Sequence, residues 1–323
     1  MRTITVALGE KTYNIEIAAG LLDQIGAKAR VLSQAVKAAI ISDSNVDPLY
    51  GERLERSLAA SGFEVTRIVF AAGEQSKNLT VLGQVYDELA RAGLTRSDLI
   101  LTLGGGVPGD LGGFAAATFL RGIDFIQVPT SLLAQIDSSV GGKVAIDLPS
   151  GKNLAGSFYQ PKAVFIDPDL LKTLPLRFLH DGLAEAIKYG CIRDAGLFAQ
   201  IAAVKSDQEL LEQADIIIET CCNIKARIVE KDEFDTGERM LLNFGHTIGH
   251  AIEKCCGFTT YTHGEGVGIG MVQMTRQTEK LGLTAAGTAE ELSRVLKKFA
   301  LPVSAVFDAQ EILQAMALHK KKI

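Results

Sequence analysis

The sequence predicts two successive domains, an α/β domain with a mostly parallel sheet and then an all-α domain. A length of 323 residues suits two domains of ordinary size. Short apolar runs alternate with amphipathic stretches in the first half, which is typical of a parallel sheet covered by helices. After LKTLP (171–175) these runs nearly vanish and long helical patterns follow. We therefore place the domains at 1–173 and 174–323.

Apolar runs mark the candidate strands of the first domain. They are AAIISD (38–43), EVTRIVF (64–70), DLILTLGGG (98–106), DFIQVP (124–129) and KAVFID (162–167). Between the earlier runs, the segments 50–60 and 79–92 carry apolar residues three and four positions apart, which predicts helices. This order of elements leads us to expect strands that run mostly parallel.

Composition argues against several classes of partner. The net charge of −5 provides no broad basic surface for nucleic acid, and aromatic residues make up only 6%. No run of about 18 apolar residues is present, and the N-terminal segment mixes charges into its apolar positions, unlike a signal peptide. The five cysteines lack CxxC spacing, which favours reduced thiols. We expect a cytoplasmic protein without nucleic-acid or membrane partners.

A glycine-rich turn follows the third candidate strand. In LILTLGGGVPGDLGGFAAA (99–117), a strand, a turn and a small-residue helix succeed one another, an arrangement in which backbone N–H groups receive a phosphate. Gly104, Gly105 and Gly106 allow close approach of a ligand, and Pro108 suits a first helical turn. Asp110 is placed to cap the helix or to bind a ribose hydroxyl. Because the spacing is not GxGxxG, a purely structural turn is the alternative.

Two polar loops follow the first two candidate strands. SDSNV (42–46) offers Asp43 and Asn45 as acceptors for sugar hydroxyls, and AAGEQSKNL (71–79) offers the polar pair Glu74 and Lys77. Open α/β sheets bind cofactors at the carboxyl ends of their strands, where these loops are expected. Each loop taken alone is equally an ordinary polar connection.

Three of the five histidines lie in two glycine-flanked motifs, LNFGHTIGHAIE (242–253) and YTHGEGVGIGM (261–271). His246 and His250 share one face of a helix, as in the HExxH motif, but the Glu of that motif is missing. His263 supplies a third nitrogen. Glu185 in DGLAEAIKYG supplies an oxygen, because a carboxylate among apolar residues is costly to bury without a partner. These residues predict a divalent metal site.

Further polar residues are embedded in small or apolar sequence. Lys188 follows Glu185 by three positions and faces the same site, and the alternative is a local salt bridge on a solvated face. The others are Arg121, Asp137, Lys143, Lys152, Asn153, Lys225, Arg239 and Asn243. A substrate that carries phosphate and carboxylate would supply partners for such charges, so we expect an anionic ligand. Any single one of them can instead be structural.

Together these segments resemble the 3-dehydroquinate synthase family, the sugar phosphate cyclases of the shikimate pathway. The resemblance lies in GEQSKN, GGGVPGD, FLRGIDFIQVPTSLLAQIDSSVGGKVAID, GKNLAGSFYQP, LKTLP, GLAEAIKYG, LNFGHTIGHAIE and HGEGV, which occur in the family's order from about position 43 to 271. It implies a Rossmann-like N-terminal domain, an all-α C-terminal domain and a homodimer. It also implies NAD and catalytic Zn²⁺ between the domains, with Co²⁺ as a substitute.

The resemblance also assigns roles to individual residues. It gives Zn²⁺ to Glu185, His246 and His263, and it makes His250 a contact of the substrate. It implies NAD contacts at Asp43, Asn45, Glu74, Lys77, Gly105, Gly106, Asp110, Thr130, Ser131, Lys152 and Thr173. It implies substrate contacts at Asp137, Lys143, Asn153, Lys188, Lys225, Arg239, Asn243 and His250, with Arg121 reaching the phosphate pocket of a neighbouring subunit.

The implied reaction converts 3-deoxy-D-arabino-heptulosonate 7-phosphate to 3-dehydroquinate and phosphate. A transient oxidation by NAD⁺ allows phosphate to leave, hydride then returns, and an aldol step closes the ring. In this reaction Asp137, Lys188 and His250 would manage hydroxyl protons, while Lys225 and Arg239 would bind the carboxylate.

The chain departs from the family at several positions. Pro108 replaces a β-branched residue, Gly112 an alanine and Ser131 a threonine, and each is small enough to keep the turn workable. Family members continue through a final segment beyond a DKK-like motif. In this chain, Lys320 or Lys321 is the candidate for the phosphate-binding lysine.

Three other functions fit parts of the pattern. They are another sugar phosphate cyclase, a metal-dependent oxidoreductase of the glycerol dehydrogenase type, and a catalytically silent dinucleotide-binding protein. Recognition of a substrate carboxylate by Lys225, Arg239 and Asn243 favours the dehydroquinate synthase reaction over that of another cyclase. Net release of NADH would indicate the oxidoreductase.

Overall fold

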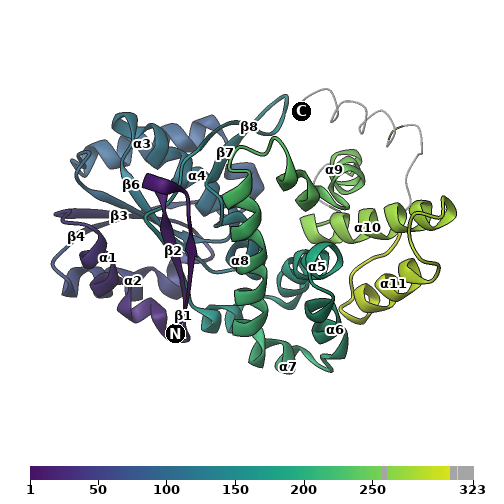
Figure 1. The fold of residues 1–323 in the computed structure, drawn as a ribbon. Helices are drawn as coiled ribbons and strands as arrows, with labels where there is room; N and C mark the ends of the chain where they lie inside the picture. The colour runs from purple at the N-terminus through teal and green to yellow at the C-terminus, as the bar shows by residue number, and fades with distance from the viewer. Residues whose placement is uncertain (257–259, 306–310, 312–323) are drawn as a thin grey trace. The chain divides into compact units, whose positions relative to one another are not determined.

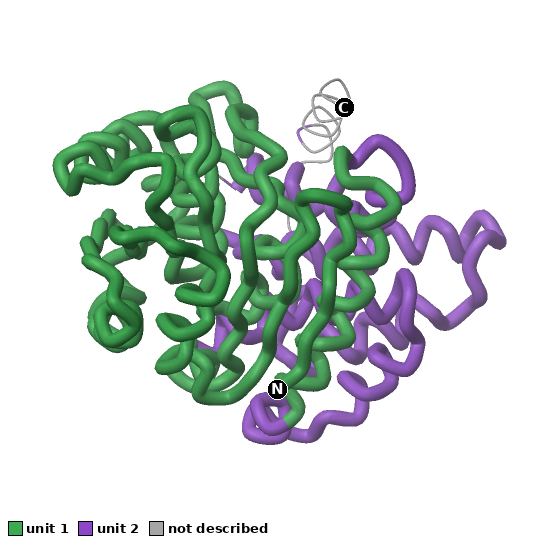
Figure 2. The backbone as a smooth tube through the Cα atoms, turned by 60° about the vertical axis from the view of Figure 1, so that its left-hand side comes forward, with its two compact units in different colours: residues 1–174, 213–234 green, residues 175–212, 235–323 purple. Residues whose placement is uncertain are grey.

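The computed structural model describes residues 1–256, 260–305 and 311, and the chain divides into two compact units (Figure 2). Unit 1 comprises residues 1–174 and 213–234, and unit 2 comprises residues 175–212 and 235–323. The units are therefore not consecutive along the chain, because helix α8 (Ala214–Lys231) belongs to unit 1. A boundary near residue 173 between consecutive domains stays a prediction. Arg2 of the first strand ties α8 into unit 1 through its ion pair with Asp215, at 3.1 Å.

Unit 1 is built on a β-sheet, several strands of which are labelled in Figure 1. The sheet has seven strands in the order β1-β2-β9-β6-β5-β3-β4. The strands are β1 (Arg2–Val6), β2 (Tyr13–Ile17), β3 (Lys37–Asp43), β4 (Glu64–Phe70), β5 (Leu99–Gly104), β6 (Asp124–Pro129) and β9 (Ala163–Ile166). Among the described strands of this sheet, β1 and β2 pair antiparallel and every other neighbouring pair is parallel. The mostly parallel sheet is confirmed. The sequence patterns did not predict β1, β2 or the separate hairpin of β7 (Lys143–Leu148) and β8 (Gly151–Phe158).

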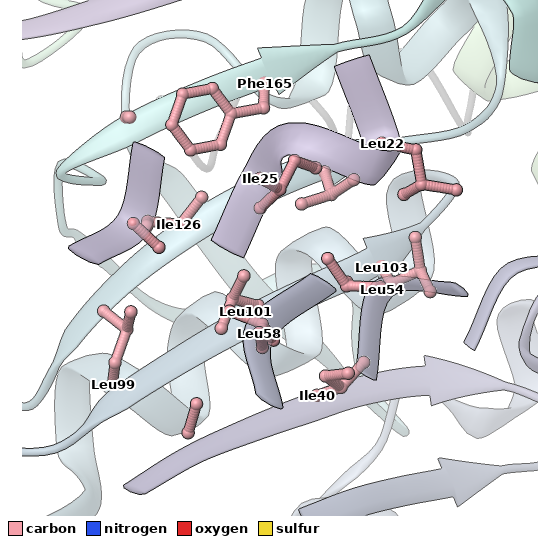
Figure 3. Packing of buried hydrophobic residues seen from close by; sticks show 14 of the residues in the cluster. Leu22, Ile25, Ile40, Leu54, Leu58, Leu99, Leu101, Leu103, Ile126 and Phe165 are labelled. Carbon is pink, nitrogen blue, oxygen red and sulfur yellow. The ribbon is translucent and has the colours of Figure 1, made fainter. Parts of the chain in front are cut away.

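Helices bury both faces of this sheet. In β5, Leu99, Leu101 and Leu103 join one apolar core, which Figure 3 shows together with Ile25 and Leu58. These two residues belong to α1 (Ile25–Leu32) and α2 (Glu52–Ala60). The intervening Ile100 joins a second core with residues of α3 (Leu79–Arg91) and α4 (Gly106–Thr118). Burial on both faces explains why the central strands read as unbroken apolar runs.

The described part of unit 2 is helical, as predicted. Its helices are α5 (Leu176–Arg193), α6 (Ala195–Ala203), α7 (Asp207–Glu212), α9 (His246–Cys255), α10 (His263–Lys280) and α11 (Thr288–Lys298). A short 3-10 helix, η8 (Glu238–Asn243), precedes α9. Within the described residues, we find no helix with the length and apolar character needed to cross a membrane. All five cysteines are free thiols.

Candidate functional site

Glycines let α9 and α10 of unit 2 pack at close range. A Cβ atom on Gly249 would lie 2.9 Å from the carbonyl carbon of Gly266, and one on Gly270 would lie 2.0 Å from the carbonyl oxygen of Gly245. Any larger residue at these positions would separate the two backbones. Gly245 also has a φ of 82°, a conformation that favours glycine. The glycines that flank the histidine motifs thus bring the histidines of both helices together.

The histidine nitrogens converge with a carboxylate of α5. One ring nitrogen of each of His246, His250 and His263 lies within 4.8 Å of the others. Oε1 of Glu185 lies 3.6 Å from Nε2 of His246 and 3.7 Å from Nε2 of His263. Two ligands of a tetrahedral zinc ion, each about 2.1 Å from it, lie about 3.4 Å apart. These distances suit one shared ion.

Glu185 is fully buried on α5, and its two carboxylate oxygens have different surroundings. Oε2 accepts a hydrogen bond from the ammonium of Lys188, while Oε1 has no hydrogen-bond partner among the described residues. The salt bridge that was the alternative interpretation of Lys188 does form, but on a buried face instead of a solvated one, since Lys188 is only 1% exposed. A buried carboxylate oxygen without a partner is costly, and a cation would remove that cost. The residues present thus fit a divalent metal ion.

In His246 and His263, the ring nitrogen that faces away from Glu185 contacts another part of the protein. Nδ1 of His263 lies 3.0 Å from Oε1 of Glu253, and Nδ1 of His246 lies 3.2 Å from the carbonyl oxygen of Phe244. Such contacts orient a ring so that Nε2 is left for a metal. Glu253 was not predicted from the sequence, although it ends the LNFGHTIGHAIE motif. Its position seven residues after His246, on the same face of α9, is the available signal.

Burial and charge act in opposite directions on the two imidazoles. Burial, together with the charge of Lys188, holds the pKa of His246 well below its ordinary value, so this ring is neutral. Burial also disfavours the charged form of His263, but Glu253, Glu185 and Asp181 outweigh it and raise the pKa of His263 to about 9. Without a metal ion, both ring nitrogens of His263 are therefore protonated at neutral pH, and metal binding at Nε2 would release one of these protons.

Asp181 fixes the start of α10 against α5. Its Oδ1 accepts a hydrogen bond from the backbone N–H of Gly264, at 2.6 Å. A Cβ atom on Gly264 would lie 2.0 Å from the Asp181 carbonyl oxygen, so only glycine fits here. Asp181 begins the DGLAEAIKYG segment, but no sequence pattern indicated this contact. The remaining predicted residues of unit 2 differ in exposure: Arg239 is buried in η8, whereas Asn243 at its end is exposed.

In unit 1, the glycine-rich turn joins β5 to α4 as predicted. β5 ends at Gly104 and α4 begins at Gly106. The carbonyl oxygen of Gly104 accepts a hydrogen bond from the N–H of Thr130 at 2.9 Å. Gly105 faces Ser131, whose Oγ would lie 3.4 Å from an added Cβ atom. The turn therefore sits beside the end of β6, at the carboxyl ends of two adjacent parallel strands, where such sheets bind ligands.

A buried lysine connects the predicted cofactor loops of unit 1. Nζ of Lys77 lies 2.5 Å from Oδ2 of Asp110 and 2.5 Å from Oδ1 of Asn153. Nζ of Lys152 lies 3.3 Å from Oε1 of Glu74. Burial lowers the pKa of Lys77, but the nearby Asp110 and Glu74 raise it by more, so the ammonium form is kept. Asp110 lies inside α4 and pairs with Lys77 instead of capping the helix.

Three further predicted residues of unit 1 lie at the ends of elements: Asp43 and Lys143 at strand ends, and Thr173 at the end of the 3-10 helix η7 (Pro168–Thr173). Asp43 is buried at the end of β3, and its Oδ1 accepts a hydrogen bond from the N–H of Asn45 at 2.8 Å. Thr173 shares a hydrogen bond with the hydroxyl of Tyr50. Lys143 begins β7 and is exposed.

Two more predicted residues of unit 1 differ sharply in their surroundings. Lys225 of α8 is buried and donates hydrogen bonds to the carbonyl oxygen of Asp137, at 2.6 Å, and to its Oδ1, at 2.8 Å. Arg121 is exposed and has a φ of 68°, between Leu120 with a φ of 51° and Gly122 with a φ of 122°. Lys320 and Lys321 lie outside the described residues.

The predicted site residues thus form two groups, one in each unit. Among the described residues, unit 2 contains Glu185, Lys188, Arg239, Asn243, His246, His250 and His263, and the other predicted ones lie in unit 1. A parallel α/β unit with a glycine-rich turn, combined with a helical unit that carries a carboxylate–histidine set, is typical of enzymes that use a dinucleotide and a divalent metal.

Comparison with known proteins specifies the family. Models of the 3-dehydroquinate synthase N-terminal and C-terminal regions match residues 67–181 and 182–322. The chain belongs to the 3-dehydroquinate synthase family. A 3-dehydroquinate synthase of Clostridium acetobutylicum is 53% identical over 322 residues, which cover 99% of this chain and 90% of the relative. The predicted family is confirmed.

Two solved structures of sugar phosphate cyclases share the fold. The 2-epi-5-epi-valiolone synthase of Streptomyces hygroscopicus, with NAD⁺ and Zn²⁺ bound, has a TM-score of 0.88 at 28% identity, covering 98% of this chain and 88% of that chain. A 2-deoxy-scyllo-inosose synthase complexed with carbaglucose-6-phosphate, NAD⁺ and Co²⁺ has a TM-score of 0.87 at 26% identity, covering 98% and 86%. The predicted fold class is confirmed.

Proposed function

We propose that this chain converts 3-deoxy-D-arabino-heptulosonate 7-phosphate to 3-dehydroquinate and phosphate, a step of aromatic amino acid biosynthesis. The observation that carries the proposal is the unsatisfied Oε1 of Glu185, which lies 3.6 and 3.7 Å from Nε2 of His246 and His263 in a chain of this family. Identity of 53% to a 3-dehydroquinate synthase, against 26–28% to cyclases with other names, favours this reaction over another cyclisation.

Each unit would hold one cofactor. In unit 2, Glu185, His246 and His263 would hold Zn²⁺ or Co²⁺. In unit 1, NAD would be held by Asp43, Asn45, Glu74, Lys77, Gly105, Gly106, Asp110, Thr130, Ser131, Lys152 and Thr173. When bound, the metal polarises a substrate hydroxyl as a Lewis acid, and NAD⁺ accepts and returns a hydride so that the net reaction is redox-neutral.

The chain's own residues bind the substrate and handle its protons. With His246 and His263 as ligands, we assign His250 to a substrate hydroxyl, because its ring lies beside both, with centroids 5.3 Å from that of His246 and 5.7 Å from that of His263. Lys188 contributes a buried ammonium beside the same carboxylate, positioned to donate to an oxygen that gains charge. Asp137, paired with Lys225, is held as a carboxylate acceptor for a second hydroxyl.

Recognition of an acid substrate depends on cationic and amide groups. We assign the substrate carboxylate to Lys225, Arg239 and Asn243, because two cations and an amide donor suit a carboxylate. Lys143 and Asn153 complete the substrate contacts. In the expected homodimer, exposed Arg121 would serve the phosphate site of the other subunit. The dimer and the cytoplasmic location stay predictions.

A phosphate-release assay tests the proposal. The metal-loaded protein is mixed with the heptulosonate phosphate and with NAD⁺, which is supplied at about one-hundredth of the substrate concentration. Phosphate, 3-dehydroquinate and NADH are then measured. We expect phosphate and dehydroquinate in equal amounts, far exceeding the NAD⁺ supplied, without net NADH. NADH accumulation with a simple polyol would instead indicate a glycerol dehydrogenase type of enzyme. Absence of both activities, with NAD⁺ bound, would indicate a silent binding protein.

A further inference from the structure

Glu253 is a buried carboxylate on α9 that no predicted role accounts for. Its side chain is 3% exposed, and its Oε1 lies 3.0 Å from Nδ1 of His263 on α10. Burying a carboxylate is costly unless a hydrogen-bonding or charged partner compensates it, and His263 is such a partner. The contact therefore links the two helices that carry the histidines.

The position of Glu253 on α9 directs it to this ring. It lies three residues after His250 and seven after His246, so all three project from one face of the helix. Its Cγ packs on α10 at Gly266, where an added Cβ atom would lie 3.4 Å away. The absence of a side chain at Gly266 thus leaves room for Glu253 to lie along α10 and reach His263.

This contact decides which nitrogen of His263 is available. Nδ1 faces Glu253, so Nε2 is left 3.7 Å from Oε1 of Glu185. The ring is therefore held between two carboxylates, one at each nitrogen. In metal sites, a carboxylate on the far nitrogen of a histidine fixes the tautomer and the ring orientation and makes the histidine a better ligand. His246 has the carbonyl oxygen of Phe244 in the equivalent place, not a carboxylate, among the described residues.

We infer that Glu253 is a positioning residue of the metal site, which holds His263 with Nε2 toward the ion while touching neither the ion nor the substrate. This inference rests on the metal site proposed above. Loss of Glu253 should therefore weaken metal binding, whereas the chemistry of the loaded enzyme should change little.

Cobalt titration of the metal-free protein tests this inference. Visible absorption of bound Co²⁺ is followed in the wild type, Glu253→Ala, Glu253→Gln and, as a matched control, Glu290→Gln at an exposed position of α11. Outer partners of metal ligands contribute about 10–100-fold in affinity, so we expect a loss of that size in Glu253→Ala. Glu253→Gln keeps an acceptor oxygen and should lose less. Saturating Co²⁺ should restore kcat in both, and the control should match the wild type.

Two results would overturn the role of Glu253. One is wild-type Co²⁺ affinity in Glu253→Ala. The other is a lower Tm of metal-free Glu253→Ala and Glu253→Gln with unchanged Co²⁺ affinity of the folded proteins, which would mean that Glu253 serves folding only. Failure of the wild type itself to bind Co²⁺ is a distinct result, because it would contradict the proposed metal site.

Discussion

Lys188 lies one helical turn after Glu185 on α5 and donates a hydrogen bond to its Oε2, with both side chains almost completely buried. The pair leaves Oε1 of Glu185 directed toward His246 and His263. One carboxylate thus has two kinds of partner, an ammonium inside the protein and, in our proposal, a metal ion. Because the two oxygens of Glu185 have different partners, the first two predictions concern Lys188 and Glu185 separately.

Lys188→Met should lower the free energy of unfolding of the metal-free protein by about 3–5 kcal/mol, because it leaves a buried carboxylate without its cation. Saturating Zn²⁺ should recover part of this loss. Urea unfolding with and without Zn²⁺ measures both effects. Lys280→Met, at an exposed position of α10, is the control and should shift stability by no more than about 0.5 kcal/mol. An equally small change in Lys188→Met would contradict the importance of the pair.

Glu185→Gln should weaken metal binding by more than about 100-fold and abolish turnover, since a ligand contributes more than its outer partners do. Metal content after dialysis, measured by atomic emission, is the readout. Glu290→Gln makes the same chemical change on the exposed face of α11 and should retain wild-type metal content. Full metal retention in Glu185→Gln would rule out Glu185 as a ligand.

Gly249→Ala should lower the free energy of unfolding by about 1–3 kcal/mol and also weaken metal binding. The added Cβ atom would meet the backbone of Gly266 at 2.9 Å and force α9 away from α10. Gly83→Ala is the matched control, because that glycine lies within α3 with no atom within 4 Å of the added Cβ. It should raise stability by up to about 1 kcal/mol. Equal effects of the two substitutions in thermal unfolding would contradict the close packing of α9 and α10.

Asp98 should give unit 1 a stability that is lost in acid. Burial raises the pKa of its carboxyl, but hydrogen bonds from the N–H groups of Lys37 and Thr95 and from the Thr95 hydroxyl lower it by more. The folded pKa is therefore below the unfolded value, so the stabilisation is present above about pH 4 and disappears as the pH falls through the folded pKa. Asp98→Asn should cost about 2 kcal/mol at pH 7, and less toward pH 3. A pH-independent difference in urea midpoints would contradict this.

Most of the strands that sequence patterns predicted are buried on both faces, namely β3, β5, β6 and β9. The predicted β4 is a partly exposed edge strand, and its EVTRIVF is rich in β-branched and aromatic residues. β5 reads as LILTLG and is buried along its whole length, so its apolar run is unbroken. The missed β8 is partly exposed throughout, and its GKNLAGSF carries little of the β-branched or aromatic character of a strand. Nor did the helical pattern of α8 indicate that it belongs to unit 1, since periodicity identifies a buried face but not the element that covers it.

The site residues also divide into those that the sequence predicted and those that it did not. Glu185 was predicted because a carboxylate among apolar residues stands out in a sequence. Glu253 and Asp181 were not, because their partners, His263 and the N–H of Gly264, are brought to them only by helix packing. The spacing of His246 and His250 indicated a shared face but did not decide which nitrogens bind a metal. In our proposal that choice depends on Glu185, which lies on another helix.

The ligand set is the central claim, and anomalous X-ray diffraction at the zinc edge from crystals of the Zn²⁺-loaded protein tests it most directly. We expect one peak about 2.0–2.2 Å from Oε1 of Glu185 and from Nε2 of both His246 and His263, with His250 outside bonding distance. A peak bound instead by His246, His250 and His263, with Glu185 paired only to Lys188, would contradict the account.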